Sequence, residues 1–147
     1  MKIVCQRVKQ ASVTINDILI SQIGSGILLF VGFTHTDTLE TIDYLASKIS
    51  KLRIFPDETG KLNLSIKEKN YDILSVSQFT LYGDLKDGNR PSFTEALPGN
   101  LAKPLYQLFN ERMSFYLGKP VFTGEFGKEM EVSLLNDGPV TIILEKM

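Results

Sequence analysis

The stretch Ser12–Phe33, SVTINDILISQIGSGILLFVGF, determines the fold class of this chain. Its short apolar runs are separated by the turn-forming groups Asn16-Asp17 and Gly24-Ser25-Gly26. Runs of this length with closely spaced turn signals indicate a meander of antiparallel strands. Polar and apolar residues alternate from Ser12 to Ile15, as expected of a strand with one wet face. The predicted strands of this region are Lys2–Val8, Ser12–Ile15, Ile18–Ile23 and Ile27–Phe33.

Two later segments have the period of amphipathic helices. The first is predicted to begin at Asp37, with Glu40 in capping-box position. Its apolar face comprises Leu39, Ile42, Leu45, Ala46, Ile49 and Leu52. The second is predicted from about Asn100 to Leu117, with Pro104 in its first turn and Gly118 as the C-cap. Its predicted core residues are Leu101, Leu105, Leu108, Phe109 and Met113.

The rest of the chain is rich in strand signals, apart from a long polar loop at Gly83–Pro98. The predicted strands are Asp72–Tyr82, which is the longest, Val121–Phe122, Met130–Leu135 and Val140–Glu145, and Leu62, Leu64 and Ile66 also alternate. No repeat or linker interrupts the pattern. We therefore predict one domain over residues 1–147 with an α+β fold, in which two helices pack outside a strand-rich, β-barrel-like core.

The composition excludes several classes of protein. The chain has 147 residues, a net charge of −1, one cysteine and one histidine. A single cysteine excludes an internal disulfide and a multi-cysteine zinc site, and the charge argues against sequence-blind coating of nucleic acid. The first residues lack a signal-peptide pattern, and the longest apolar run, Ile27–Val31, is too short to span a bilayer. We expect a soluble, cytoplasmic protein with no metal, no cofactor, no membrane contact and no DNA partner.

Three hydrogen-bonding side chains, Ser77, Gln78 and Thr80, interrupt the apolar run of the predicted strand Asp72–Tyr82. In one interpretation they form the wet face of an edge strand. In the other, the strand end opens into a pocket, where freed backbone N–H groups hold an oxyanion and Thr80 positions a reacting group. Without an adjacent general base, Thr80 is a weak candidate for a covalent nucleophile.

The dipeptide Gly138-Pro139 precedes a β-branched run, although proline donates no N–H group to a sheet. It is either a plain loop before the last strand or a rigid wall that presents carbonyl groups and no Cβ at the glycine. A wall of that kind would sort ligands by their shape.

Other reactive or charged residues also have two interpretations. His35 is either an exposed loop residue or the histidine of a hydrolase, and Cys5 is either a small buried hydrophobe or a nucleophile. The cations near the polar loop and the second helix either are solvated or bind phosphate groups. These cations are Lys86, Arg90, Lys103, Arg112, Lys119 and Lys128.

Together these motifs resemble those of the D-aminoacyl-tRNA deacylases, first described as D-tyrosyl-tRNA deacylases, over essentially the whole chain. The most specific are VSQFTL at Val76–Leu81 and NDGPVT at Asn136–Thr141. The other matching segments are Val4–Val8, Ala11–Val13, Leu52–Phe55, Gly60–Asn63, Arg90–Phe93 and Thr123–Gly127. Met130 is retained from a Phe-Gly-Ala-x-Met pattern, whereas Lys128 replaces its small residue.

The resemblance implies an enzyme that hydrolyses the ester bond of D-aminoacyl-tRNA and so keeps D-amino acids out of translation. It implies a homodimer in which a cis Gly138-Pro139 reaches the partner's active site and rejects L-aminoacyl esters, while achiral glycine is admitted. Thr80 matches the family's catalytic-site threonine, with Ser77 and Gln78 beside it. The substrate-binding positions implied by the resemblance are Phe79 and Gln78 near the terminal adenosine of tRNA, Met130, and Arg7, which orients the Gly-Pro carbonyls.

Two alternatives stay open. The first is a relative that removes a mischarged L- or achiral amino acid with the same Gly-Pro in trans form. The second is a non-catalytic nucleic-acid-binding or assembly module on the same fold.

Overall fold

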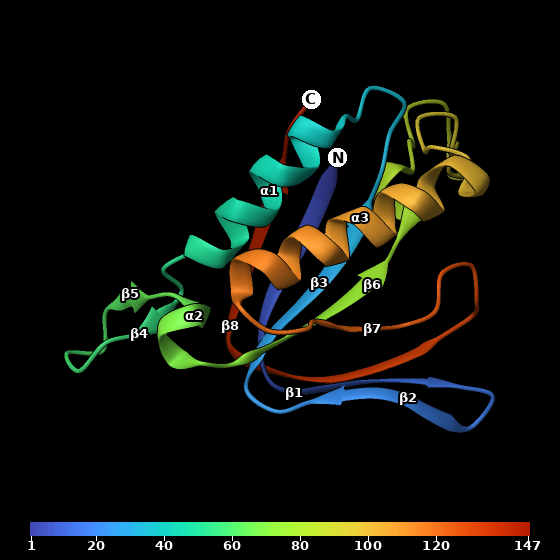
Figure 1. The fold of residues 1–147 in the computed structure, drawn as a ribbon. Coiled ribbons are helices and arrows are strands. Elements are labelled where there is room, and N and C mark those ends of the chain that lie inside the picture. Colours follow the sequence, from blue (N-terminus) through green and yellow to red (C-terminus); the bar gives the residue numbers. More distant parts are fainter.

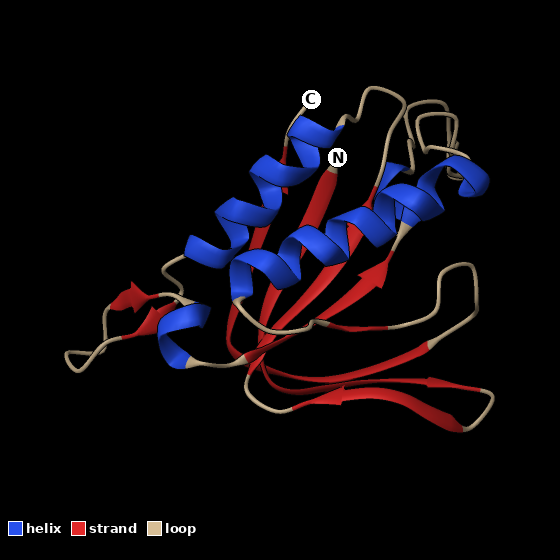
Figure 2. Ribbon diagram, in the orientation of Figure 1, coloured by secondary structure: helices blue, strands red, loops and turns tan.

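The computed structural model describes residues 1–147, and two long helices lie across one face of a curved sheet (Figure 1 and Figure 2). The helices are α1 (Leu39–Lys51), α2 (Ile66–Lys69) and α3 (Gly99–Leu117). The strands are β1 (Lys2–Ile15), β2 (Ile18–Ile23), β3 (Gly26–Gly32), β4 (Phe55–Pro56), β5 (Leu62–Leu64), β6 (Asp72–Ser77), β7 (Phe122–Thr123) and β8 (Glu131–Glu145). A 3₁₀ turn, η1, covers Phe79–Tyr82.

Strand β1 is the centre of the main sheet, because it pairs with three other strands. Its first half pairs with β3, its second half with β2, and β8 runs antiparallel along its length. The predicted break between Val8 and Ser12 is wrong, since pairing continues through Gln10 and Ala11 with shifts of register near Val8. Such bulges bend a strand without ending it. Likewise, the two strands predicted at the C-terminus form the single strand β8.

Both faces of β3 are buried, which accounts for its continuous apolar run. Ile27 and Leu29 belong to a cluster under the helices, whereas Leu28 belongs to a second cluster inside the curl of the sheet. The second cluster also contains residues from β1, β2 and β6, namely Val8, Ala11, Val13, Ile15, Ile23, Leu74 and Val76. A strand buried on both faces reads as apolar throughout. The predicted α+β fold with a β-barrel-like core is confirmed.

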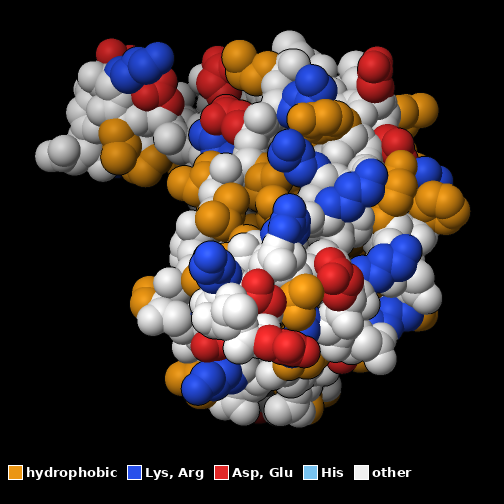
Figure 3. All heavy atoms as spheres, turned by 90° about the vertical axis from the view of Figure 1, so that its left-hand side faces the viewer, with side chains coloured by type: hydrophobic (Ala, Val, Ile, Leu, Met, Phe, Trp, Pro, Cys, Tyr) orange, Lys and Arg blue, Asp and Glu red, His pale blue; other side chains and the backbone are white.

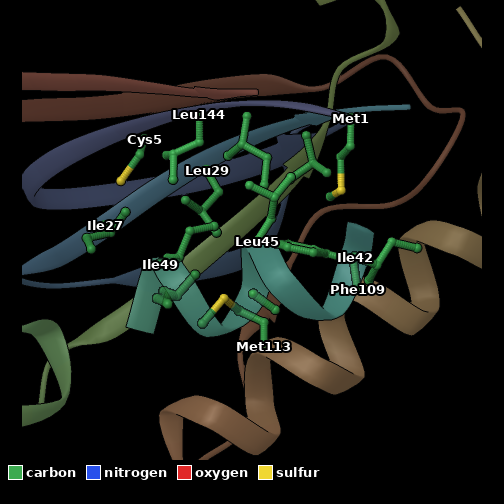
Figure 4. Close-up of a cluster of buried hydrophobic side chains, with 14 of the residues drawn as sticks. Met1, Cys5, Ile27, Leu29, Ile42, Leu45, Ile49, Phe109, Met113 and Leu144 are labelled. Atoms are coloured by element: carbon green, nitrogen blue, oxygen red, sulfur yellow. The ribbon is translucent and has the colours of Figure 1, made fainter. Parts of the chain in front are cut away.

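The helices α1 and α3 cover the first cluster, and Figure 4 shows their side chains pointing at those of the sheet. Ile42, Leu45 and Ile49 of α1 meet Phe109 and Met113 of α3, all of them buried. Gly118 caps α3 as predicted, with φ of 84°. Fully burying side chains of this size contributes about 1.5–3 kcal/mol each, so these contacts hold the helices on the sheet.

The predicted start of the first helix and two predicted core residues need correction. Thr38, rather than Asp37, caps α1, and its hydroxyl accepts a bond from the Thr41 N–H. The Asp37 carboxylate instead accepts bonds from the Met1 amino group and the Thr34 N–H. Two leucines predicted for the core lie in the first turns and are exposed, Leu39 by 66% and Leu101 by 54%.

Two further local predictions are wrong. Pro104 is the sixth residue of α3 and not part of its first turn, so the Asn100 carbonyl lacks its usual helical partner. The alternation through Ile66 does not continue as a strand, because Ile66 opens α2. Ser65 and Glu68 form a capping box there, a signal that the sequence contains.

In the structure, no helix combines the length and the apolar composition that crossing a membrane requires.

Gly26 allows β3 and β6 to approach each other. A Cβ at this position would lie 1.9 Å from the Asp72 carbonyl oxygen, whereas a Cβ at Gly24 would meet nothing within 4 Å. We therefore expect Gly26→Ala to lower the free energy of unfolding by about 1–3 kcal/mol, because a backbone atom must move. Gly24→Ala in the same turn should change it by less than about 0.5 kcal/mol. Urea unfolding followed by circular dichroism measures both, and equal losses would contradict the backbone clash.

Candidate active site

A cavity of about 730 Å³ opens where the parallel strands β3 and β6 end. Val31 is the last residue of β3 to pair with β6, and its partner is Ser77. The predicted strand therefore ends at Ser77 and not at Tyr82, because no neighbouring ladder remains and the chain turns into η1. The wall of the cavity combines Val31, Gly32, Phe33, Val76, Ser77, Gln78, Phe79, Phe93, Ala96, Leu97, Pro98, Gly99, Ala102, Phe126, Gly127, Lys128, Glu129, Met130 and Val132.

The structure brings four of the predicted site residues to this cavity and a fifth to its edge. Ser77, Gln78, Phe79 and Met130 line it. Thr80 is exposed, and its hydroxyl accepts a hydrogen bond from the Gln78 amide. Because its oxygen accepts that bond, the Thr80 O–H proton is left to donate to a ligand. In an ideal strand Gln78 and Thr80 would share a face, and η1 still brings them into contact.

A buried tyrosine supports the strand that leads into the site. The Tyr106 hydroxyl of α3 donates to the Ser75 carbonyl at 2.8 Å, and burial raises the pKa of this tyrosine. The Ser75 hydroxyl in turn donates to the Tyr106 hydroxyl oxygen at 3.4 Å. Both hydroxyl groups in this apolar layer therefore have a partner, as buried polar groups require.

The segment 83–98, which we call the rim loop, stands at the upper right of Figure 1 and is fastened at two places. Asp84 and Ser92 exchange backbone hydrogen bonds of 2.8 and 2.9 Å, which close the loop on itself. The Thr34 hydroxyl donates to the Glu95 carbonyl at 2.6 Å, and His35 Nε2 lies 2.8 Å from the Thr94 carbonyl oxygen. His35 is thus an exposed loop residue outside the cavity wall, in agreement with the first of its two interpretations.

The rim loop contributes a residue that the sequence analysis missed. Phe93 lines the cavity and packs edge to face on Phe79, with ring centroids 5.1 Å apart. The only sequence signal was its place in the matching segment Arg90–Phe93. Loop position alone does not indicate where such a side chain points.

Gly138 and Pro139 lie elsewhere in the subunit, exposed on β8 and joined by a cis peptide bond. Arg7 on β1 is only 8% exposed, and its Nε donates to the Asp137 carbonyl at 3.0 Å. Its Nη1 donates to the Ile54 carbonyl at 2.7 Å. The Arg7 side chain therefore holds the residue before Gly138 and fixes where the dipeptide emerges.

The strand register separates Gly138-Pro139 from the cavity of the same subunit. Arg7 pairs with Ile27 on β3, whereas Ser77 pairs with Val31, four residues further along that strand. Four residues span about 13 Å, and the three strand spacings from β8 to β6 add about 14 Å sideways. The predicted site residues thus form two groups within one subunit.

Other predicted groups lie outside the cavity. Burial raises the pKa of the Cys5 thiol to about 12, so this cysteine is protonated and is not a nucleophile at neutral pH. The structure contains no group of three or more His, Cys, Asp or Glu side chains placed to bind a metal ion.

The predicted cations differ in their surroundings. Arg112 is paired with Asp43 at 2.6 Å, Lys119 with Asp72 at 3.0 Å, and Lys86 lies 3.9 Å from Asp84. Arg90, Lys103 and Lys128 form no ion pair, and Lys128 lines the cavity. Figure 3 shows basic and acidic side chains interspersed on one face, with apolar ones in a hollow beside the lobe at the upper left.

A family model described as "D-Tyr-tRNA(Tyr) deacylase" matches residues 4–145. This chain belongs to the D-aminoacyl-tRNA deacylase family. A deacylase of that description from Exiguobacterium sibiricum is 54% identical over 146 residues, which are 99% of this chain and 100% of the relative. One from Listeria monocytogenes is 51% identical over 145 residues, 99% and 95% of the two chains. The predicted family and the predicted enzyme class, a hydrolase, are confirmed.

Two solved structures share the deacylase fold. One, described as "c-Myc DNA Unwinding Element Binding Protein", has a TM-score of 0.94 at 43% identity and covers 100% of this chain and 99% of its own. The other, described as a "probable eukaryotic D-amino acid tRNA deacylase", has a TM-score of 0.85 at 18% identity over 97% of both chains. The second likeness supports the fold alone.

The fastening of the rim loop can be tested at Thr34. In Thr34→Val the Glu95 carbonyl loses its partner, and a lost hydrogen bond of this kind costs about 1 kcal/mol. The Leu97 amide, bonded to the Phe33 carbonyl, should then exchange its hydrogen about fivefold faster. Thr36→Val, at an exposed position in the same connection, should leave exchange unchanged. Unaltered exchange at Leu97 in Thr34→Val would show that the hydroxyl does not hold the loop.

Proposed function

We propose that the chain hydrolyses the ester between a D-amino acid and the terminal ribose of tRNA in the cavity at Ser77–Thr80. We further propose that it works as a homodimer, in which Gly138-Pro139 of each subunit completes the cavity of the other. The proposal rests on one observation. Within one subunit the exposed Gly138-Pro139 lies far from the cavity, although rejecting L-aminoacyl esters requires the dipeptide to lie beside the bound ester. A second copy, placed with its dipeptide at the cavity mouth, resolves this separation.

Hydrolysis needs little catalytic assistance from the protein, because an aminoacyl-tRNA ester is already activated. Water attacks the carbonyl carbon, an oxyanion forms, and the bond to the ribose oxygen breaks as that oxygen takes up a proton. The first N–H groups of a helical turn have no partner within the turn, so the amides of Phe79 and Thr80 at the start of η1 suit the oxyanion. Thr80 orients the ester or the water, and the terminal 2′-hydroxyl of tRNA assists.

Chirality is sorted by exclusion in this proposal. Gly138 presents backbone without a Cβ, and a D side chain points away from it, whereas an L side chain would collide with the dipeptide. A rigid wall excludes a substrate with an added group more strongly than a pocket discriminates against a substrate that lacks a group. The filter is indifferent to the kind of D side chain, and it admits glycine.

Two alternatives make different predictions. A relative specialised for L- or achiral residues would prefer L-Ala or Gly esters to D-Tyr esters. A binding module, suggested by the DNA-related description of one structural neighbour, would bind nucleic acid without cleaving the ester. The net charge of −1 and the interspersed charges of Figure 3 favour a small contact with an RNA end over extended DNA binding.

Hydrolysis of three esters tests the function directly. We expect D-Tyr-tRNA to be cleaved at least about 100-fold faster than L-Tyr-tRNA, because exclusion by a hard contact separates the two isomers. Gly-tRNA should also be cleaved, and EDTA should change none of the rates. Cleavage of both tyrosyl isomers at equal rates would contradict the chiral filter. Binding of tRNA or single-stranded DNA without cleavage of any ester would favour the binding module.

Subunit complementation tests whether the site is shared between two copies. Alone, Thr80→Ala should lower kcat by roughly 100-fold. Gly138→Ala should also lose activity, because φ of 125° strains an alanine and its Cβ would lie 3.1 Å from Arg7 Nη2. A mixed dimer of the two variants, purified through two different tags, has one site with both changes and one site with neither. We expect it to recover about half of the wild-type activity.

A second glycine with positive φ supplies the control for this experiment. Gly60→Ala places an alanine at a similarly positive φ of 83° in open space, and it should keep full activity. If each site lay within one subunit, the mixed dimer would be as inactive as its parents. If the chain were monomeric, no species carrying both tags would be recovered.

A further inference from the structure

Phe93 and Phe79 expose two aromatic rings at the mouth of the cavity. Phe93 is 38% and Phe79 57% exposed, although both are apolar. Their ring planes meet at 68°, and their centroids lie 5.1 Å apart. Aromatic side chains left uncovered beside a nucleic-acid site are the usual platforms on which unpaired bases stack.

The rim loop holds Phe93 in place before any ligand arrives. The backbone bonds between Asp84 and Ser92 close the loop directly before it, and Thr94 and Glu95 directly after it are bonded to His35 and Thr34. The Phe93 ring also rests on Gly83, where an added Cβ would lie 3.2 Å from Phe93 Cε1. A fixed ring loses little freedom on binding, so its stacking energy is available for affinity.

The angle between the two rings determines how many bases can stack on them. Two parallel rings could enclose one base, but rings at 68° turn their faces in different directions. One planar base therefore cannot stack on both. Two successive bases of a single-stranded end can, each on its own ring, because such an end is flexible enough to splay its bases.

We propose that Phe93 stacks on the base next to the terminal adenosine, the last cytosine of the tRNA CCA end. This inference rests on the proposed function and on the place beside the terminal adenosine that the family resemblance implies for Phe79. Arg90, on the same loop and without an ion pair, adds positive charge near the backbone of the same nucleotide. Phe93 is thus a substrate-binding residue that reads the RNA end and not the amino acid.

Substrates of increasing length test this assignment. The probes are D-tyrosyl esters of adenosine, of the dinucleotide CpA and of complete tRNA. With Phe93→Ala we expect kcat/KM to fall about 10- to 100-fold on CpA and on tRNA, mainly through KM, since a lost base–aromatic stack has this effect. On the adenosine ester, kcat/KM should change by less than about twofold.

Matched variants separate stacking from bulk. Phe93→Trp should keep wild-type activity, whereas Phe93→Leu, which preserves apolar volume without an aromatic face, should resemble Phe93→Ala. Phe122→Ala removes a ring of similar exposure, 41%, that does not line the cavity, and it should leave all three substrates unaffected. Circular dichroism of each variant confirms that it is folded.

The results that overturn the assignment are distinct from those that overturn the function. An equal loss on all three esters would place Phe93 at the adenosine or the ester, and no loss on any would remove it from the binding site. Wild-type activity in Phe93→Leu would show that apolar volume, and not stacking, accounts for the contribution of Phe93. An inactive wild-type protein on every D-tyrosyl ester would refute the proposed function and, with it, the stacking.

Discussion

The sharing of strand β1 among three partners is the constraint on which the rest of the structure depends. A strand has only two hydrogen-bonding edges, so three partners must divide its length between them. β8 occupies one edge throughout, and β3 and β2 follow each other on the opposite edge. The register shifts of β1 beside Val8 fall where β3 gives way to β2, and such bulges bend a strand. One half of the sheet then lies under α1 and α3, and the other half curls around a second core.

The candidate active site is a direct consequence of where the parallel ladder stops. Because β3 and β6 are parallel, their carboxyl ends meet at the same edge of the sheet, and the cavity opens there. β3 ends at Gly32, so the chain after Ser77 has no neighbour to pair with and turns into η1. The turn into η1 that ends the strand also exposes Phe79 and Thr80, and it brings the Gln78 amide to the Thr80 hydroxyl.

Several exposed features share one explanation if the site is built from two copies of the chain and an RNA end. Gly138-Pro139 is exposed on β8, held by Arg7, and does not line the cavity of its own subunit. The rings of Phe79 and Phe93 are exposed beside the cavity, although exposing apolar rings to water is unfavourable. The partner dipeptide would cover the amino-acid side of the cavity, and the last bases of tRNA would cover the rings. In that arrangement the protein would supply the shape filter, and the RNA would supply part of the chemistry.

Local patterns in the sequence were enough for the fold class, the period of α1 and α3, the cap at Gly118 and, through VSQFTL and NDGPVT, the family. These features depend on neighbours within a few residues. The four-residue helix α2 was missed, because it is too short for a period to show, and only its capping box marked it. The boundary of β6 was also missed, since it depends on where β3 ends.

The sequence by itself determined which residue types the site contains. Only the tertiary structure decided that Ser77, Gln78, Phe79 and Met130 share a cavity with Phe93, and that Gly138-Pro139 lies outside it. The physical reason is that strand register and burial are set by hydrogen bonds and contacts between segments distant in the chain, which no local pattern records.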